Sequence, residues 1–295
     1  MAPIKFRGLF PPSKTRHVPR ASLLTFVIKD LFSIPQLLCL GALSQTALLL
    51  LLPPHLALAP TLLFLLYTLA STALQSILPS HNPWLSDIMP DRATAQFPNA
   101  TYDPSHPDSK PLFGSSPSSR QVVVFHIGVR YSHPLGLLAP GVLEFRARLA
   151  AQYDELALRA REYGFLGGSF WRGAERSRVN AGMAVMYFAS LEGLHAFAHD
   201  EVHRGAWEWY EGFVRRTGHR HIGIFHETFV VPAERWETIY GNCPPVLMAG
   251  TSVPVVDEGN GEEEWVRPVV DGATPRLRSK YGRMGKTQGG YQLGE

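Results

Sequence analysis

The strongest constraint on the fold is the stretch from Leu31 to Ser86, which contains no Asp, Glu, Lys or Arg. Two apolar runs lie inside it, at about residues 31–52 and 56–78, and a Pro-Pro-His connection separates them. Each run is close to the roughly 20 residues that an α-helix needs to cross the hydrocarbon core of a bilayer. We therefore predict a transmembrane hairpin over residues 31–78. The alternative is a buried helical hairpin of a soluble domain, which the length of uncharged sequence disfavours.

Charged residues on either side of the apolar runs predict how the hairpin is oriented. Residues 1–30 form a basic N-terminal segment, with basic side chains at Lys5, Arg7, Lys14, Arg16, Arg20 and Lys29. Because basic flanks stay on the cytoplasmic side, we expect both ends of the hairpin and the domain that follows it in the cytoplasm. The expected location is a membrane, crossed twice, with the endoplasmic reticulum as the organelle. A cleaved signal peptide fits less well, because the first apolar run begins late and a second one follows it.

The rest of the chain divides by composition into a linker, a domain and a tail. Residues 79–119 are rich in Pro, Ser, Asn and Asp, which is typical of a linker. Residues 120–250 carry periodic apolar patterns and form the predicted globular domain. Residues 251–295 lack a hydrophobic period, and we predict a disordered tail there. The formal charge of +3 is mild and spread out, so we expect no nucleic-acid partner.

Within residues 120–250, helix-like and strand-like segments alternate in the order β-α-β-β-α-β. This order is the ferredoxin-like plan, an α+β fold. A second helix begins after Ser190, whose side chain is suited to cap it. The other expected elements are strands at Gln121–Arg130, Phe165–Trp171, Ala181–Ala189 and Ile222–Val231, and a helix at Leu137–Tyr163.

Histidines and large aromatic residues concentrate near the second helix. Half of the 12 histidines fall between His195 and His226, in a stretch that also contains Trp207, Trp209 and Tyr210. Histidine is the side chain whose charge changes most easily near neutral pH. Indole and phenol rings line apolar pockets while presenting a polar edge. This composition predicts the wall of a ligand cavity.

Helical periodicity orders the three histidines of the second helix by their distance from the core. The core-facing stripe is formed by Leu191, Leu194, Ala198, Val202 and Trp209. His195 falls within about 40° of the centre of this stripe, His199 at its edge and His203 further toward solvent. We therefore expect His195 to point into a cavity between helix and sheet. The competing interpretations are a satisfied core histidine at position 195 and a solvated one at position 203.

The first and last strands carry a second group of polar residues. His126 and Arg130 share one face of the first strand, and His226 and Glu227 alternate along the last. Because these strands are neighbours in the ferredoxin-like plan, His126 and Arg130 can meet His226 or Glu227 across the ladder. A fixed guanidinium would stabilise a carboxylate or enolate oxygen. The alternative is an Arg–Glu ion pair that only fixes the strand register.

Cofactor and metal signals are weak. His195 and His199 form an i, i+4 pair that can place two imidazoles on one metal, with His226, Glu227 or His126 as a third ligand, but we assign no metal site. A single histidine bound to haem is a related alternative. The chain has no Rossmann glycine fingerprint, P-loop or G-x-S-x-G motif. The cofactor therefore stays open between none and haem.

Several long phrases of the sequence together resemble one known family. They are FHIGVRYSHPLGLLAPG (Phe125–Gly141), YGFLGGSFW (Tyr163–Trp171), LHAFAHDEVHRGAWEWY (Leu194–Tyr210) and HIGIFHETFVVPAERWETIYGN (His221–Asn242). In order and spacing they resemble the fungal fumagillin-pathway-type monooxygenase family, a branch of the dimeric α+β barrel superfamily. The resemblance implies a homodimer and a monooxygenase of secondary metabolism, acting on a lipophilic small molecule such as a terpene or polyketide intermediate.

With this resemblance, the residues lead to a specific hypothesis about the site. A cofactor-independent oxygenase needs a base that turns the substrate into an anion able to reduce oxygen. We predict His195 or His126 as that base and Arg130 as the residue that stabilises the anion. Predicted substrate contacts are His199, Trp207, Trp209, Tyr187, His226 and Glu227. The alternatives are a haem-dependent dehydratase or lyase on the same fold and a non-catalytic membrane scaffold.

Overall fold

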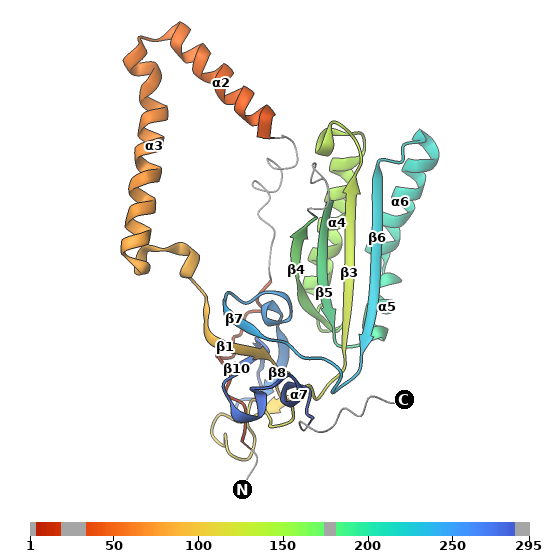
Figure 1. The fold of residues 1–295 in the computed structure, drawn as a ribbon. Helices are drawn as coiled ribbons and strands as arrows, with labels where there is room; N and C mark the ends of the chain where they lie inside the picture. The colour runs from red at the N-terminus through yellow and green to blue at the C-terminus, as the bar shows by residue number, and fades with distance from the viewer. Residues whose placement is uncertain (1–3, 19–33, 174–180, 287–295) are drawn as a thin grey trace, which may run out of the picture. The chain divides into compact units, whose positions relative to one another are not determined.

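The protein is described from a computed structural model, in which residues 4–18, 34–173 and 181–286 are placed well enough to describe. By its internal contacts the chain divides into two compact units. One unit comprises Ser22–Ile88, and the other combines Met1–Ala21 with Met89–Glu295. Figure 1 shows their elements, and each unit is described by itself.

The smaller unit is a pair of apolar helices. Helix α2 covers Ile34–Leu51 and helix α3 covers Pro54–Ile77, and both are long and apolar enough to cross a membrane. Almost all of their side chains are exposed within this unit. Gln45 joins the helices, because its amide donates to the carbonyl of Ala57 at 3.1 Å and its oxygen accepts from the Thr61 hydroxyl at 2.8 Å. Two 3₁₀ turns follow, η1 (Pro79–His81) and η2 (Pro83–Leu85).

The larger unit is built on a four-stranded antiparallel sheet with the order β4-β5-β3-β6. Its strands are β3 (Val122–Tyr131), β4 (Phe165–Arg172), β5 (Ala181–Phe188) and β6 (Ile222–Val231). Helix α4 (Val142–Leu158) connects β3 to β4, and helices α5 (Leu191–Ala198) and α6 (Glu201–Thr217) connect β5 to β6. This confirms the predicted ferredoxin-like topology.

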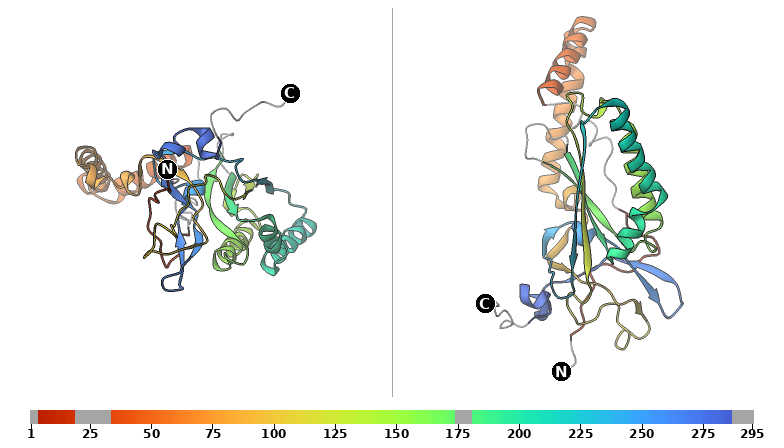
Figure 2. Two further views of the ribbon diagram at one scale, coloured as in Figure 1. Left: turned by 90° about the horizontal axis from the view of Figure 1, so that it is seen from below. Right: turned by 90° about the vertical axis from the view of Figure 1, so that its right-hand side faces the viewer.

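Helices cover only one face of this sheet, as the right-hand view of Figure 2 shows. Alternation along β3 explains the arrangement, since Val123, Phe125 and Ile127 pack toward the helices while Val122 and Val124 turn to the other side. We call that other side the open face. Its end near Val122 packs against the strands described next, and its remainder carries half-buried and exposed side chains.

Helix α4 is shorter than the predicted helix over Leu137–Tyr163. A 3₁₀ turn, η3 (Gly136–Leu138), comes first, and α4 begins only after Gly141, which has a left-handed φ of 76°. A Cβ atom at Gly141 would lie 2.6 Å from the Phe213 ring of α6, so glycine allows both the turn and the close approach of the helices.

Two small sheets complete the larger unit. Most of their strands lie within the predicted linker over 79–119 and the predicted disordered tail over 251–295, so both predictions are wrong where these strands form; residues 287–295 of the tail lie outside the described residues. One sheet has the order β10-β1-β7 and the other the order β2-β8-β9. The strands are β1 (Met89–Ala95), β2 (Thr101–Tyr102), β7 (Tyr240–Cys243), β8 (Val253–Asp257), β9 (Glu263–Val266) and β10 (Val269–Asp271), followed by the short helix α7 (Lys280–Arg283). Two 3₁₀ turns, η4 (Leu247–Gly250) and η5 (Pro275–Leu277), belong to the same region.

The reason for the error is the distance in sequence between pairing partners. Strand β1 pairs with β10, and Ala93 lies opposite Asp271. Each strand is only two to seven residues long, so none shows a clear period by itself. Burial becomes visible only when distant segments meet, as for Val253 and Val255, which are almost fully buried.

Candidate functional site

A break between α5 and α6 decides which histidines face the sheet. Ser190 caps α5, with its hydroxyl accepting from the amide of Gly193 at 3.1 Å. Asp200 then caps α6, with one carboxylate oxygen accepting from the amide of Val202 at 2.9 Å. The other oxygen accepts from the Tyr163 hydroxyl and from the Arg159 guanidinium, both at 2.8 Å. The predicted single helix is therefore two helices that Asp200 holds in a fixed relation.

Because the break resets the helical phase, the predicted orientation of His195 is wrong. Leu194 and Phe197 are the buried residues of α5, while His195 and His199 are exposed. The ring of His199 reaches back to the carbonyl of His195, at 2.8 Å. His203, which was expected in solvent, is half-buried, and its ring lies 5.5 Å from that of Phe197 in an edge-on contact.

The surroundings of His203 favour the neutral imidazole. Its Nδ1 atom is buried and has no hydrogen-bond partner among the described residues. Burial is the main cause that lowers the pKa of His203, and the nearby His226 and His199 lower this pKa further. The Ala198 carbonyl and the Asp200 carboxylate oppose the shift. A buried imidazole nitrogen without a partner destabilises the fold by about 1–3 kcal/mol. Burial therefore favours the neutral imidazole at His203, and its Nδ1 atom is left without a partner in the part of the chain that the structure describes.

His226 belongs to the same side of the sheet as His203. It lies opposite Ile127 in the register of β3 and β6, so it shares the helix-facing side with Ile127 and Phe125. The rings of Phe125 and His226 are 5.7 Å apart. Phe125 and His226 from the sheet, with Phe197 and His203 from the helices, form what we call the histidine site.

His126 and Glu227 lie side by side on the open face. This is one of the cross-strand contacts that the sequence allowed. They are direct partners in the β3–β6 register, and Nδ1 of His126 lies 3.7 Å from a carboxylate oxygen of Glu227. The Phe229 ring packs 5.5 Å from that of His126. The Glu227 side chain is mostly exposed, so in a monomer this pair stabilises the fold by only about 0–1 kcal/mol.

Arg130 lies further along the same face, but not beside Glu227. Its backbone partners are Gly223 on β6 and Ala181 on β5, and its side chain makes no hydrogen bond or ion pair with a residue that the structure describes. The ring of Phe225 lies over the backbone between His126 and Arg130, where a Cβ atom on Gly128 would be 2.1 Å from that ring. Glycine at this position thus makes room for an aromatic residue on the open face.

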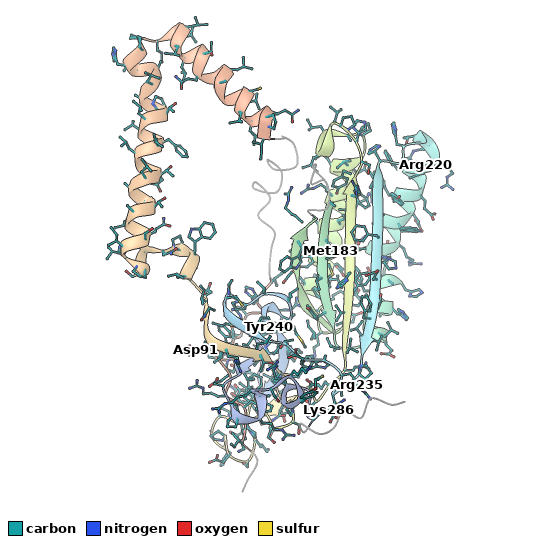
Figure 3. All side chains as sticks on the ribbon, viewed as in Figure 1. Asp91, Met183, Arg220, Arg235, Tyr240 and Lys286 are labelled. Carbon is teal, nitrogen blue, oxygen red and sulfur yellow. The ribbon has the colours of Figure 1, made fainter. Side chains whose placement is uncertain are left out.

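The other predicted contact residues lie apart from the histidine site. Trp209 stacks between Phe145 and Phe213, with ring centroids at 6.1 and 5.3 Å, and so packs α4 against α6. Trp207 is exposed on α6. Tyr187 is buried where the open face packs against the small sheets, and burial raises its pKa to about 12. Figure 3 labels Met183 and Tyr240 on the two sides of this packing.

A further histidine group was missed by the sequence reasoning. His221 is buried, and its Nε2 atom donates to the carbonyl of Pro140 at 2.9 Å. Its ring lies 5.0 Å from that of His133 and 5.2 Å from that of His219. Since a carbonyl accepts, Nε2 of His221 carries the proton. The group ties the α6–β6 turn, marked by Arg220 in Figure 3, to the loop before α4.

Neither a metal cluster nor an enclosed cavity marks the histidine site. In the part of the chain that the structure describes, no group of three or more His, Cys, Asp or Glu side chains can hold a metal ion. A cavity of about 240 Å³ lies among Ala160, Phe165 and Val253, and one of about 620 Å³ among Phe6, Pro12 and Phe113. No histidine lines either cavity. Of the helix histidines, His203 is the one turned toward the sheet, where a haem ligand would be needed.

Comparison with known proteins identifies close and distant relatives. The profile of the family Monooxygenase af470-like matches residues 122–248. A curated protein named Monooxygenase af470, from Aspergillus fumigatus, is 35% identical over 278 residues, which cover 94% of this chain and 96% of the relative. The match therefore extends over the apolar helices and the small sheets as well as the ferredoxin-like sheet.

Solved structures are much less similar. An aldoxime dehydratase in complex with butyraldoxime is 17% identical, with a TM-score of 0.37, over 44% of this chain and 36% of that chain. SnoaB, a cofactor-independent oxygenase from Streptomyces nogalater, is 13% identical, with a TM-score of 0.25, over 37% of this chain and 90% of that chain. These TM-scores are too low to assign a fold or a function. The ferredoxin-like assignment is based on the strand order of this chain.

Proposed function

The chain belongs to the Monooxygenase af470-like family, and from this premise we propose that it oxygenates a lipophilic small molecule at the histidine site. Family membership makes it an oxidoreductase of the monooxygenase kind. The substrate class we propose is a terpene or polyketide intermediate of secondary metabolism. The observation that carries the choice of site is the half-buried imidazole of His203, whose pKa is lowered by burial and whose Nδ1 atom has no hydrogen-bond partner among the described residues.

His203 has the properties of a general base. A base must be unprotonated at the working pH and must reach the proton that it removes. Burial favours the neutral His203 ring, and its Nδ1 atom has no partner within the described ranges of the chain. Because that atom is buried in the free chain, we propose that substrate entry exposes it. The apolar rings of Phe197 and Phe125 favour an apolar substrate at the same place. His195, being exposed, is no longer proposed for this role.

The reaction we propose starts from a carbon atom that carries two acidic hydrogens. His203 removes one proton, and the electron pair of the C–H bond stays on carbon as a carbanion or enolate. This anion reduces O₂, so that one oxygen atom becomes a carbonyl on the same carbon. The other oxygen atom leaves as water with the two hydrogens. The substrate supplies all the electrons, and the protein supplies the base and an apolar site.

For the open face, we propose that a second copy of the chain covers it and completes a dimeric α+β barrel. The support is the exposure of large apolar side chains there, since Phe225 and Phe229 are 46% and 47% exposed. A second copy would enclose Phe225, Phe229 and the His126–Glu227 pair, and would give Arg130 a desolvated environment in which its charge acts more strongly. His126 and Arg130 would then form a second candidate site in the dimer, on the face of the sheet opposite His203.

We also propose that α2 and α3 lie in a membrane, with the larger unit on its cytoplasmic side at the endoplasmic reticulum. The support is their length, their lack of charge and their exposure within their own unit. The match to the relative includes this stretch, because it covers nearly the whole of both chains. A membrane would concentrate a lipophilic substrate near the enzyme.

Anthrone, a lipophilic ketone with an acidic methylene group, is a suitable probe of this chemistry. The full chain in detergent should accelerate oxygen uptake and anthraquinone formation in air. Replacing His203 by Leu should lower kcat/KM by about 10²-fold or more if it is the base. The matched control is His195→Leu, which changes the same side chain at an exposed position and should alter kcat/KM less than about twofold.

The same substitution separates a catalytic role from a structural one. Leucine removes a buried nitrogen that lacks a partner, so His203→Leu should leave the melting temperature unchanged or raise it. Loss of activity together with a lower melting temperature would mean that His203 only supports the fold. A Soret band that follows activity through purification would replace the cofactor-free route with haem chemistry.

A further inference from the structure

Residues 4–18, which precede the apolar helices in sequence, are built into the larger unit. We call them the strap. Gly8 forms an antiparallel bridge with Val270 of β10, and Ser13 forms one with Trp265 of β9. The strap therefore contacts both small sheets, although α2 and α3 separate it from them along the chain.

Backbone hydrogen bonds hold the strap at both bridges. The amide of Leu9 donates to the carbonyl of Val269 at 2.9 Å. Ser13 and Trp265 exchange two hydrogen bonds, of 2.9 and 2.7 Å, as a directly opposed antiparallel pair does. The strap thus satisfies amides and carbonyls that β9 and β10 would otherwise present as free edges.

One strap side chain belongs to the core of the small sheets. Phe6 is 6% exposed and packs with a cluster that includes Phe113, Val266 and Leu277. Two positions on, a Cβ atom at Gly8 would lie 2.7 Å from the Phe113 ring, so the strap approaches that ring as closely as glycine allows. Removing the strap would uncover this cluster.

Arg16 extends the strap to the ferredoxin-like sheet. Its guanidinium donates to the carbonyl of Phe165, in β4, at 2.8 Å and to that of Ala157, near the end of α4, at 3.3 Å. It also lies over the rings of Phe165 and Trp265, at 4.9 and 5.3 Å. Arg16 thus connects β9, α4 and β4, and a chain without it would leave these carbonyls without their donor.

From this threading we infer that the apolar hairpin is an insertion in a folded unit and that its two ends lie on the same face of the membrane. The inference rests on the proposed membrane location of α2 and α3. The strap and its partners β9 and β10 must be on one side, because a hydrocarbon core about 30 Å thick would otherwise separate them. An odd number of crossings is therefore excluded.

The same threading requires that the first apolar helix stays in the mature protein. Cleavage after α2 would release Phe6 and Arg16 together with the rest of the strap. The partner that covers α2 and α3 is then the lipid bilayer. Inside it, Gln45 and Thr61 satisfy each other across the hairpin, so the polar groups between the helices are paired.

A first experiment tests the strap in the native full chain. Nζ of Lys14 lies 2.6 Å from a carboxylate oxygen of Glu262, and both side chains are exposed to reagent. A carbodiimide should join them by an amide bond, with one water taken up as the urea by-product. Mass spectrometry of the digest should find a peptide of the strap bound to one containing Glu262, and mixing with isotope-labelled chains should show that the bond is intramolecular. Lys14→Arg, which keeps the charge but cannot be coupled, is the matched control.

A second experiment tests the sides of the membrane. Epitope tags are placed before Met1 and after Glu295 of the full chain, and protease is added to sealed microsomes. We expect both tags to remain on the mature chain and both to be digested. Protection of only one tag, absence of the first tag, or lack of the Lys14–Glu262 bond in the wild type would overturn the inference.

Alkaline carbonate extraction separates this inference from the proposal on which it rests. If the chain stays in the membrane pellet but its two tags lie on opposite sides, the inference is refuted and the membrane location stands. Release of the full chain would refute the membrane location and the inference with it. The proposed chemistry at His203 would stand or fall separately, by the anthrone assay.

Discussion

Asp200 is not part of the histidine site, but its replacement should disturb the geometry of that site more clearly than any other single change. It caps α6, accepts from the Tyr163 hydroxyl and pairs with Arg159. Replacing it by Ala removes all three interactions. Replacing it by Asn keeps a good cap and an acceptor for Tyr163, and weakens only the ion pair. Comparing the two variants therefore separates the contribution of the hydrogen bonds at the break from that of the ion pair with Arg159.

The expected loss of stability follows from the three contacts. Removing the cap costs about 1 kcal/mol. The Tyr163 side chain is 1% exposed, so leaving its hydroxyl unpaired adds about 1–2 kcal/mol. The ion pair adds about 0.5 kcal/mol or less, since Arg159 is partly exposed and keeps Glu155 and Glu162 as partners. Asp200→Ala should thus cost about 3 kcal/mol and Asp200→Asn about 1 kcal/mol or less.

Thermal unfolding of the full chain, followed by near-ultraviolet circular dichroism in detergent, measures this difference. At about 2–4 °C per kcal/mol, Asp200→Ala should lower the melting temperature by roughly 6–12 °C. In a Tyr163→Phe background the same substitution should cost about 1–2 kcal/mol less, because the hydroxyl has already been removed. Equal effects of Ala and Asn, or no coupling to Tyr163, would refute the account of the break given above.

Acid should reproduce part of the same effect. The amide of Val202, followed by the Tyr163 hydroxyl and Arg159, holds the pKa of the Asp200 carboxyl below its ordinary value. A carboxylate whose pKa is lowered by folding stabilises the protein above its ordinary pKa, near 4, and this contribution is lost as the pH falls through the folded value. The wild type should lose more stability than Asp200→Asn between about pH 4 and pH 2.

The remaining predictions concern the proposed site and the dimer. If His203 is the base, its lowered pKa places the acidic limb of kcat/KM below about pH 6.5, and His203→Leu should abolish that limb. Because the unfolded chain binds this proton first, stability should also fall as the pH drops from about 6.5 to the folded pKa. Phe225→Glu should convert a micromolar dimer to monomer in light scattering, whereas Trp207→Glu, a similarly exposed aromatic residue on α6, should not. Arg130→Lys should change kcat/KM for anthrone less than about twofold, because Arg130 lies on the face of the sheet opposite His203; a loss of about tenfold or more would move the reaction to the open face of the dimer, where a planar guanidinium can hold an oxyanion.

The sequence was sufficient for the parts of the fold that are regular over many residues. The period of two in Val122–Arg130 and the apolar stripes of the helices predicted the ferredoxin-like plan, and the uncharged stretch predicted two long apolar helices. That plan also made the first and last strands neighbours, so a contact of His126 with His226 or Glu227 was expected, and the register in the structure selects Glu227.

The histidine site was harder to predict because it depends on a single break. One continuous helix turns His195 to the sheet, and a break at Asp200 turns His203 there instead. The signal was present as Asp200, a strong N-cap residue in the middle of an apolar period, followed by Glu201. Contacts of Arg16 and Phe6 could not be foreseen, since nothing local connects the strap to residues more than 100 positions away.

The strap also sets an order of events during synthesis. Arg7 and its ion-pair partner Asp271 are 264 residues apart in the sequence. At about 5–20 residues per second, the ribosome needs roughly 15–50 s to reach the second partner after making the first. During that interval Phe6 and Arg16 have left the ribosome but have no binding surface. The unit therefore folds only after translation has nearly finished, and the strap with its Phe6 side chain is a natural client for chaperones at the membrane until then.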